Sequence, residues 1–141
     1  MRILFGILLL LHGFIVCAQS SASFKPIGGT PNPAWMGWFP VNLGQSLPFA
    51  KLGIEQAAGV KALGILWLIA GITLVLAALA VLHFLIPLPW WRVLAILGAS
   101  LSLLMLVLYF HPFYLIGFSA SLILLIALLS KTWEALPNLG L

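Results

Sequence analysis

Residues 93–130 read VLAILGASLSLLMLVLYFHPFYLIGFSASLILLIALLS, which is 38 positions without a charged residue. One continuous helix of that length would measure about 57 Å at roughly 1.5 Å per residue, whereas the hydrocarbon core of a bilayer is about 30 Å thick. His111 and Pro112 fall near the middle. Proline disfavours helical geometry at the residue before it and has no backbone N–H. The stretch therefore predicts two helices, 93–110 and 113–130, joined by a very tight turn.

Two other stretches, 3–24 and 62–91, are also free of charge. The first predicts a short helix over 3–18 that ends at Gln19 and the serines after it. The second predicts a full span over 62–86, closed by Pro87 and Pro89. The fold class is therefore all-α: a transmembrane bundle of four helices in one integral membrane domain, with one long loop over 19–61.

The composition supports a membrane protein and excludes several other classes. Hydrophobic residues make up 64% of the chain and charged residues 6%, both far from the values of soluble domains. The net charge of +4 comes from six scattered basic residues, which form no patch for nucleic acid. A single cysteine, Cys17, excludes an internal disulfide and a Cys-x-x-Cys site.

The first helix has an alternative interpretation. Arg2, the apolar run and the small residues Cys17 and Ala18 also suit a cleaved signal peptide, which would leave three spans. Only one basic residue precedes the apolar run, and Gly6 and Gly13 have the spacing of packing residues. These points favour a retained helix.

Four spans divide the polar residues between two sides of the membrane. Side I holds both termini and the loop 86–92, and side II holds the long loop and the turn at His111. Aromatic residues at both boundaries agree with this division: Trp90, Trp91 and Trp133 on side I, and Trp35, Trp38, Tyr109 and Tyr114 on side II. Side I also has a slight excess of positive charge, with Arg2, Arg92, Lys131 and the amino terminus against Lys25, Lys51 and Lys61. We therefore expect both termini in the cytoplasm, with the chain in a bacterial inner or plasma membrane.

Small residues recur at helical spacing in every expected span. In lipid, helices associate through such residues because the hydrophobic effect does not drive their contact. A glycine-lined substrate path is the alternative, but polar partners for a substrate are scarce, which favours packing. The residues are Gly6 and Gly13; Gly64, Gly71 and Ala78; Ala95, Ala99, Gly98 and Ser102; and Gly117 and Ser121.

The long loop begins with irregular, turn-rich sequence over 20–33. Trp35, Trp38 and Phe39 follow at helical spacing and would form one aromatic face. We favour an anchor in the headgroup region for this face over a lid or a partner surface. Residues 47–58 predict a short helix that breaks at Gly59.

Ionisable groups inside a membrane are candidates for function, and only His12 clearly qualifies. His83 falls on side I and His111 on side II, so the three histidines cannot share a metal. Glu55 and Glu134 also fall on opposite sides, which excludes a pair of catalytic carboxylates. No known phosphate-loop, zinc or nucleophile motif is present. We therefore assign no catalytic residue, metal ligand or cofactor.

A loose group of polar residues remains toward side II: His12, Glu55, Tyr109, His111, Tyr114 and Ser119. The sequence favours a structural role for His12, as a neutral imidazole hydrogen bonded to a serine, a tyrosine or a backbone carbonyl of another helix. The functional alternative is a ligand site, with His12, Tyr109, Tyr114 and Ser119 as its contacts.

Three segments carry a resemblance to a known group: residues 1–16 with the Leu11-His12-Gly13 step, residues 64–71, and Trp90-Trp91-Arg92. They resemble small four-helix bacterial membrane proteins without an established activity, which look distantly like the DoxX-type bundle. The resemblance implies a four-helix fold and a membrane address. In that group a second histidine often follows the first, whereas residues 14–17 here contain none.

Two functions follow as hypotheses. One is an accessory or scaffold protein that acts by helix–helix association with other membrane proteins. The other is a binder or carrier of a small lipophilic molecule, a quinone or a lipid. An enzyme is the least supported class. A filled bundle would favour the scaffold, and an apolar cavity beside His12 would favour the carrier.

Overall fold

The computed structural model describes residues 1–24, 46–54, 57–111 and 114–130, and these residues form helices and connecting turns without a strand. This confirms an all-α fold for the described part of the chain. The helices are α1 (Arg2–Ala18), α2 (Ser21–Phe24), α3 (Leu47–Leu52), α4 (Ala58–Val81), α5 (Trp91–Leu108) and α6 (Leu115–Leu129).

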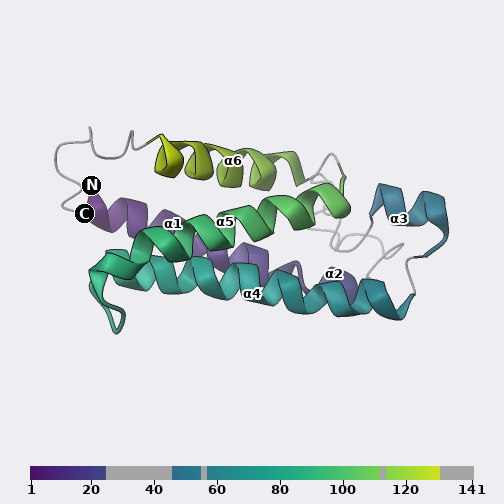
Figure 1. Cartoon of the computed structure of the whole chain (residues 1–141), viewed down its shortest axis with the longest axis horizontal. Coiled ribbons are helices and arrows are strands. Elements are labelled where there is room, and N and C mark those ends of the chain that lie inside the picture. Colours follow the sequence, from purple (N-terminus) through teal and green to yellow (C-terminus); the bar gives the residue numbers. More distant parts are fainter. Residues whose placement is uncertain (25–45, 55–56, 112–113, 131–141) are drawn as a thin grey trace, which may run out of the picture.

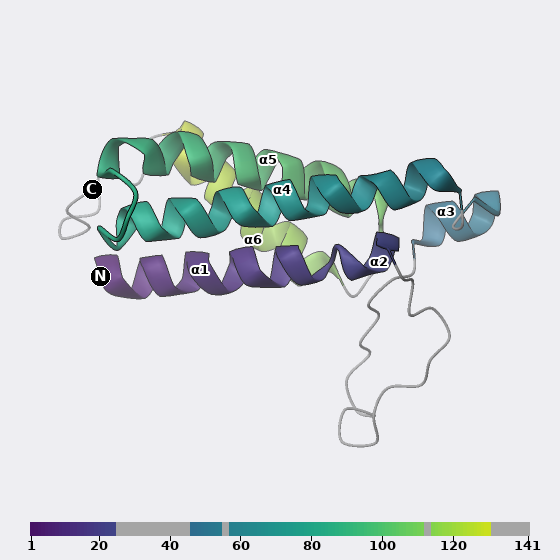
Figure 2. The ribbon, with the colours of Figure 1, turned by 90° about the horizontal axis from the view of Figure 1, so that it is seen from below.

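The long helices α1, α4, α5 and α6 run lengthwise beside one another (Figure 1). Helix α4 lies between α1 and α5, and α6 packs against α5 (Figure 2). The start of α1, the α4–α5 turn and the end of α6 lie at one end of the molecule, the side I of the sequence prediction. Helices α2 and α3 lie at the opposite end, side II, where α5 also ends.

Among the described residues, two helices, Ala58–Val81 and Leu88–Leu108, are long and apolar enough to cross a membrane by length and composition. In the second, a 3-10 turn over Leu88–Trp90 precedes α5. Helices α1 and α6 are apolar but shorter. The core is centred on α4, whose buried residues include Trp67, Ala70, Leu74 and Ala77.

Glycine brings α1 and α4 into backbone contact. A Cβ atom on Gly71 would lie 2.3 Å from the Cys17 sulfur and 2.8 Å from the Gly13 carbonyl oxygen. A Cβ on Gly13 would lie 2.9 Å from the Val75 backbone nitrogen. The prediction that these glycines serve helix packing is confirmed. It is wrong for Gly117, where the nearest atom to an added Cβ, in the Leu106 side chain, would be 3.9 Å away.

Helix α4 ends at Val81, so the prediction of a span to Ile86 is wrong. His83 adopts a left-handed φ of 59°. The amide of His83 donates to Ala80 and that of Phe84 to Leu79, a paired arrangement that closes a helix C-terminus. This position usually holds glycine, which is why the sequence shows no stop signal before Pro87.

Helices α5 and α6 are separate and lie side by side, which confirms that residues 93–130 do not form one kinked rod. The connection is longer than the tight turn predicted at Pro112, because α5 ends at Leu108 and α6 begins at Leu115. Pro112 itself lies outside the described residues.

At side II, two helix predictions need correction. Helix α3 ends at Leu52, because Gly53 adopts a left-handed φ of 66° and its amide donates to Ala50. Gly59, the predicted break, instead lies in the first turn of α4. Residues 21–24, predicted irregular, form the short helix α2. The aromatic face of Trp35, Trp38 and Phe39 lies outside the described residues.

The predicted aromatic boundary is only partly correct. Trp90 is 58% exposed at side I, as expected. Trp91 is instead buried, with its ring edge-to-face against Phe5 at 6.0 Å. Tyr109 and Tyr114 at side II are also buried. These three rings therefore belong to the interior, and Trp133 lies outside the described residues.

Candidate functional site

His12 links three helices through a chain of hydrogen bonds. Its Nε2 lies 2.8 Å from the Ser121 hydroxyl oxygen of α6. The Ser121 hydroxyl in turn donates to Ser102 of α5 at 3.1 Å. Both serines are fully buried, and His12 is half-buried. Because the Ser121 hydroxyl uses its hydrogen in the bond to Ser102, its oxygen must accept the hydrogen bond from His12. The imidazole therefore carries its hydrogen on Nε2.

This geometry confirms that His12 bonds to a serine of a neighbouring helix. The serine is Ser121, whereas Ser119, which the sequence analysis grouped with His12, is exposed. Two residues along a helix correspond to a rotation of about 200°, so Ser119 and Ser121 occupy nearly opposite faces of α6. Spacing alone could not select between them without the rotation of α6 about its axis.

The 2.8 Å contact also falls in the range at which a histidine activates a serine nucleophile. Ser121, however, has no exposed surface and donates its proton to Ser102. A substrate therefore has no access to its oxygen in this arrangement. The contact is therefore interpreted as a structural hydrogen bond between α1 and α6.

Tyr109 forms a second polar cluster at side II. Its hydroxyl donates to the Val60 carbonyl at 3.2 Å and is hydrogen bonded to Ser23. Its ring meets Phe49 edge-to-face at 5.0 Å and Trp67 at 5.9 Å. Tyr109 therefore joins α2, α3, α4 and the end of α5. Sequence reasoning missed the roles of Ser23 and Trp67, which carry no signal beyond their residue types.

Ser46 anchors α3 to the same end. Its hydroxyl oxygen accepts from the Phe49 amide at 3.1 Å as the N-cap of α3. The hydroxyl also donates to the Leu108 carbonyl at 3.0 Å, and the Leu47 amide donates to Phe110. These bonds satisfy carbonyls at the end of α5 that have no partner within the helix.

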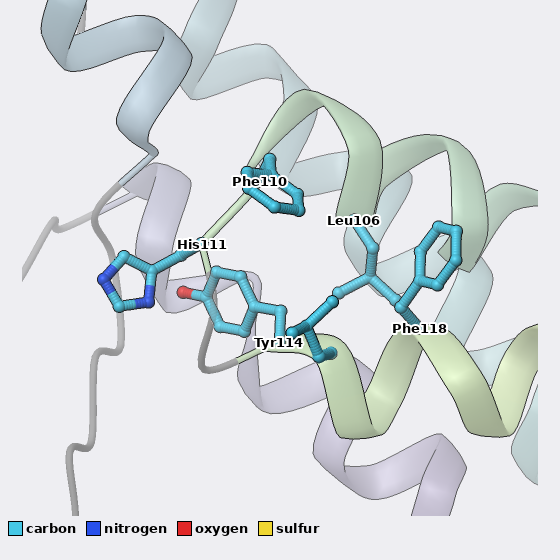
Figure 3. Close-up of a pocket in the computed structure, with 6 residues that line it drawn as sticks. Leu106, Phe110, His111, Tyr114 and Phe118 are labelled. Atoms are coloured by element: carbon cyan, nitrogen blue, oxygen red, sulfur yellow. The ribbon is translucent and has the colours of Figure 1, made fainter.

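A cavity of about 50 Å³ opens between the end of α5 and the start of α6. Figure 3 shows its aromatic lining, with the Tyr114 hydroxyl directed toward His111. The rings of these two residues lie 6.0 Å apart. The lining residues are Leu106, Phe110, His111, Tyr114, Leu115 and Phe118. His12 and Ser119 are not among them.

The candidate residues therefore lie in four different places. His12 is in the serine chain, Tyr109 in the second cluster, Tyr114 at the cavity, and Ser119 on the outer surface of α6. Glu55, which the sequence groups with them, lies outside the described residues. Within the described residues, no group of three histidine, cysteine or acidic side chains has the arrangement of a metal site.

At side I, the arginines Arg2 and Arg92 each donate a hydrogen bond to a distant part of the chain. The Arg2 guanidinium Nη1 donates to His83 Nε2 at 3.3 Å. Arg92 Nη2 donates to the Leu128 carbonyl at 2.8 Å, which caps the last turn of α6 from the first turn of α5. Both contacts join segments far apart in the sequence, and neither was predicted.

No protein-family model, curated protein or solved structure matches the chain. The site is therefore interpreted from its geometry alone.

Proposed function

We propose that this chain is a small multi-pass membrane protein that acts as an accessory or scaffold subunit, through association of its helices with another membrane protein. In this proposal α1, α4, α5 and α6 each cross the bilayer once. Both termini are then on side I, in the cytoplasm, as the slight charge excess there favours.

The distribution of apolar and charged residues supports the crossing of a bilayer. All four helices carry large apolar side chains on their outer faces, for example Leu8, Ile69, Leu104 and Ile123, each at least 40% exposed. Soluble monomers rarely expose so much contiguous apolar surface. The described charged residues lie at the two ends of the molecule: Arg2 and Arg92 in the first turns of α1 and α5 at side I, and Lys51 and Lys61 in α3 and the start of α4 at side II.

Helices α1 and α6, with 17 and 15 residues, extend for about 26 Å and 22 Å at roughly 1.5 Å per residue. Both lengths fall short of a typical core of about 30 Å. A bilayer accommodates such a mismatch by local thinning at modest cost. Helix α2 also continues α1 after a short turn, which lengthens that crossing.

The observation that carries the association proposal is the outer face of α6. Only Ser121 and Leu128 of this helix are buried. Exposed Ser119 and Ala120 lie between Ile116 and Ile123, which are 76% and 67% exposed. Small residues flanked by isoleucine permit close approach of a second helix in lipid. The glycines of α1 and the central Gly64 and Gly71 of α4, by contrast, are already covered by neighbours.

The carrier function has less support. The cavity of about 50 Å³ does not open beside His12. An engineered cavity that binds benzene measures about 150 Å³, so a quinone ring would need the helices to separate. This cavity therefore gives no support to the transport of a ring-containing molecule.

The test is photo-cross-linking in native membranes. A photoreactive amino acid at position 119 should give a discrete adduct with another membrane protein. The same amino acid at Ser100, an exposed serine on the outer face of α5, is the matched control and should not. Ala120→Leu should abolish the adduct by blocking close approach. Equal adducts from both positions, or none from position 119, would refute association through α6.

The membrane topology is tested separately. Reporter fusions after Leu141 and between Gly28 and Asn32 should report opposite compartments, with the terminal fusion cytoplasmic. A periplasmic signal from the terminal fusion alone would indicate the opposite orientation, with side I facing the periplasm. Equal signals would rule out four crossings.

A further inference from the structure

Among the residues that the structure describes, no carboxylate accompanies the contact between Arg2 and His83. Arg2 begins α1, and His83 follows α4, 81 residues later, yet their side chains meet at 3.3 Å. The two acidic residues of the chain, Glu55 and Glu134, both lie outside the described residues. Since arginine has five N–H donors, the bond to His83 leaves several for an oxyanion.

The first turn of α1 adds further donors at this place. Met1 occupies the cap position and makes no side-chain capping bond. The first amides of a helix have no partner within it, and the helix dipole favours negative charge beside them. The Arg2 guanidinium and the first amides of α1 therefore supply hydrogen-bond donors at the same end of this helix, beside His83.

The turn that carries His83 also exposes an apolar pair. His83 and Leu85 have φ values of 59° and 64°, left-handed conformations that cost a non-glycine residue roughly 1–2 kcal/mol each. Between and beside them, Phe84 and Leu85 are 58% and 81% exposed. The turn leaves the molecule sideways, across the long axis of the helices (Figure 1). In a membrane this direction runs along the bilayer surface.

We propose that Arg2, His83 and the first turn of α1 bind the phosphate of an anionic phospholipid at side I, while Phe84 and Leu85 lie among its acyl chains. The planar guanidinium suits a phosphate diester, and a helix N-terminus suits the same group. Basic clusters beside membrane helices on the cytoplasmic side recognise anionic headgroups in the same way. This inference rests on the membrane placement proposed above, but not on association through α6.

The test uses purified protein in mild detergent with added phosphatidylglycerol, phosphatidylcholine or inorganic phosphate. Native mass spectrometry measures retained lipid, and thermal unfolding measures stabilisation. Wild-type protein should retain phosphatidylglycerol and unfold at a higher temperature in its presence. Phosphatidylcholine and inorganic phosphate should have much smaller effects.

Two variants and one control identify the site. Arg2→Gln and His83→Gly should each weaken phosphatidylglycerol retention about tenfold, as expected for one lost charge-assisted hydrogen bond. Glycine adopts the left-handed conformation of position 83 readily, so His83→Gly removes the imidazole and keeps the turn. Lys61→Gln, which removes an exposed positive charge at side II, should leave retention unchanged.

Undiminished retention by both Arg2→Gln and His83→Gly would overturn the proposal, as would an equal loss in Lys61→Gln. Equal stabilisation by inorganic phosphate would show a site for free anions and overturn the lipid assignment. Failure of the scaffold function would appear elsewhere, as an absent adduct from position 119. The two results are therefore distinguishable.

Discussion

His12 of α1 and Ser121 of α6 are hydrogen bonded at 2.8 Å, although 109 residues separate them in the chain. This hydrogen bond between side chains connects α1, the first long helix, with α6, the last. Ser102 of α5 extends it at 3.1 Å, so three helices share one polar chain. In a bilayer such a bond fixes the rotation of α6, because an unpaired polar group facing lipid is costly.

Ser121→Ala should lower the free energy of unfolding by about 0.5–2 kcal/mol, since it leaves the His12 imidazole without its partner. Thermal unfolding in mild detergent measures the change. Ser119→Ala is the matched control two residues away and should have little effect, because Ser119 is exposed. Equal effects of the two variants would argue against a stabilising hydrogen bond between His12 and Ser121.

Gly71→Ala should destabilise the protein by about 1–3 kcal/mol, because the new methyl group would overlap Cys17 and force α1 away from α4. Gly117→Ala should be neutral or stabilising, since its Cβ position is open and alanine favours the helix. Unfolding of both variants in the same detergent makes the comparison. A harmless Gly71→Ala would contradict the close α1–α4 contact.

Leu85→Gly should stabilise the protein by up to about 1 kcal/mol, because glycine removes the strain of the left-handed φ of 64°. The gain is reduced by the greater entropy of glycine in the unfolded chain. Phe84→Gly is the control, since position 84 has no positive φ and should only lose stability. Equal losses in both variants would mean that the turn stores no such strain.

Ser46→Ala should cost about 0.5–2 kcal/mol, because it removes both the cap of α3 and the donor to Leu108. Hydrogen exchange should increase most at the amides of α3, beginning with Phe49. Ser100→Ala, at an exposed serine of α5, serves as the reference. A uniform change across the molecule would point to a global effect and not to the loss of a cap.

The sequence by itself determined that residues 93–130 form two helices and which face of α4 meets a neighbouring helix. The 38 uncharged residues at 93–130 exceed one crossing, and proline near their middle requires a break, so α5 and α6 were predictable. The spacing of Gly64 and Gly71 likewise marked the face of α4 that meets another helix. Both inferences rest on length and period, which are local properties of the chain.

Only the tertiary structure decided the partners of the polar groups and the end of α4. Ser121 rather than Ser119 meets His12, because that choice depends on the rotation of α6 against α1. His83 ends α4 in a conformation that usually requires glycine, and its side chain there meets Arg2 from the far end of the sequence. Such contacts depend on how whole helices pack, and no local pattern of residues encodes that arrangement.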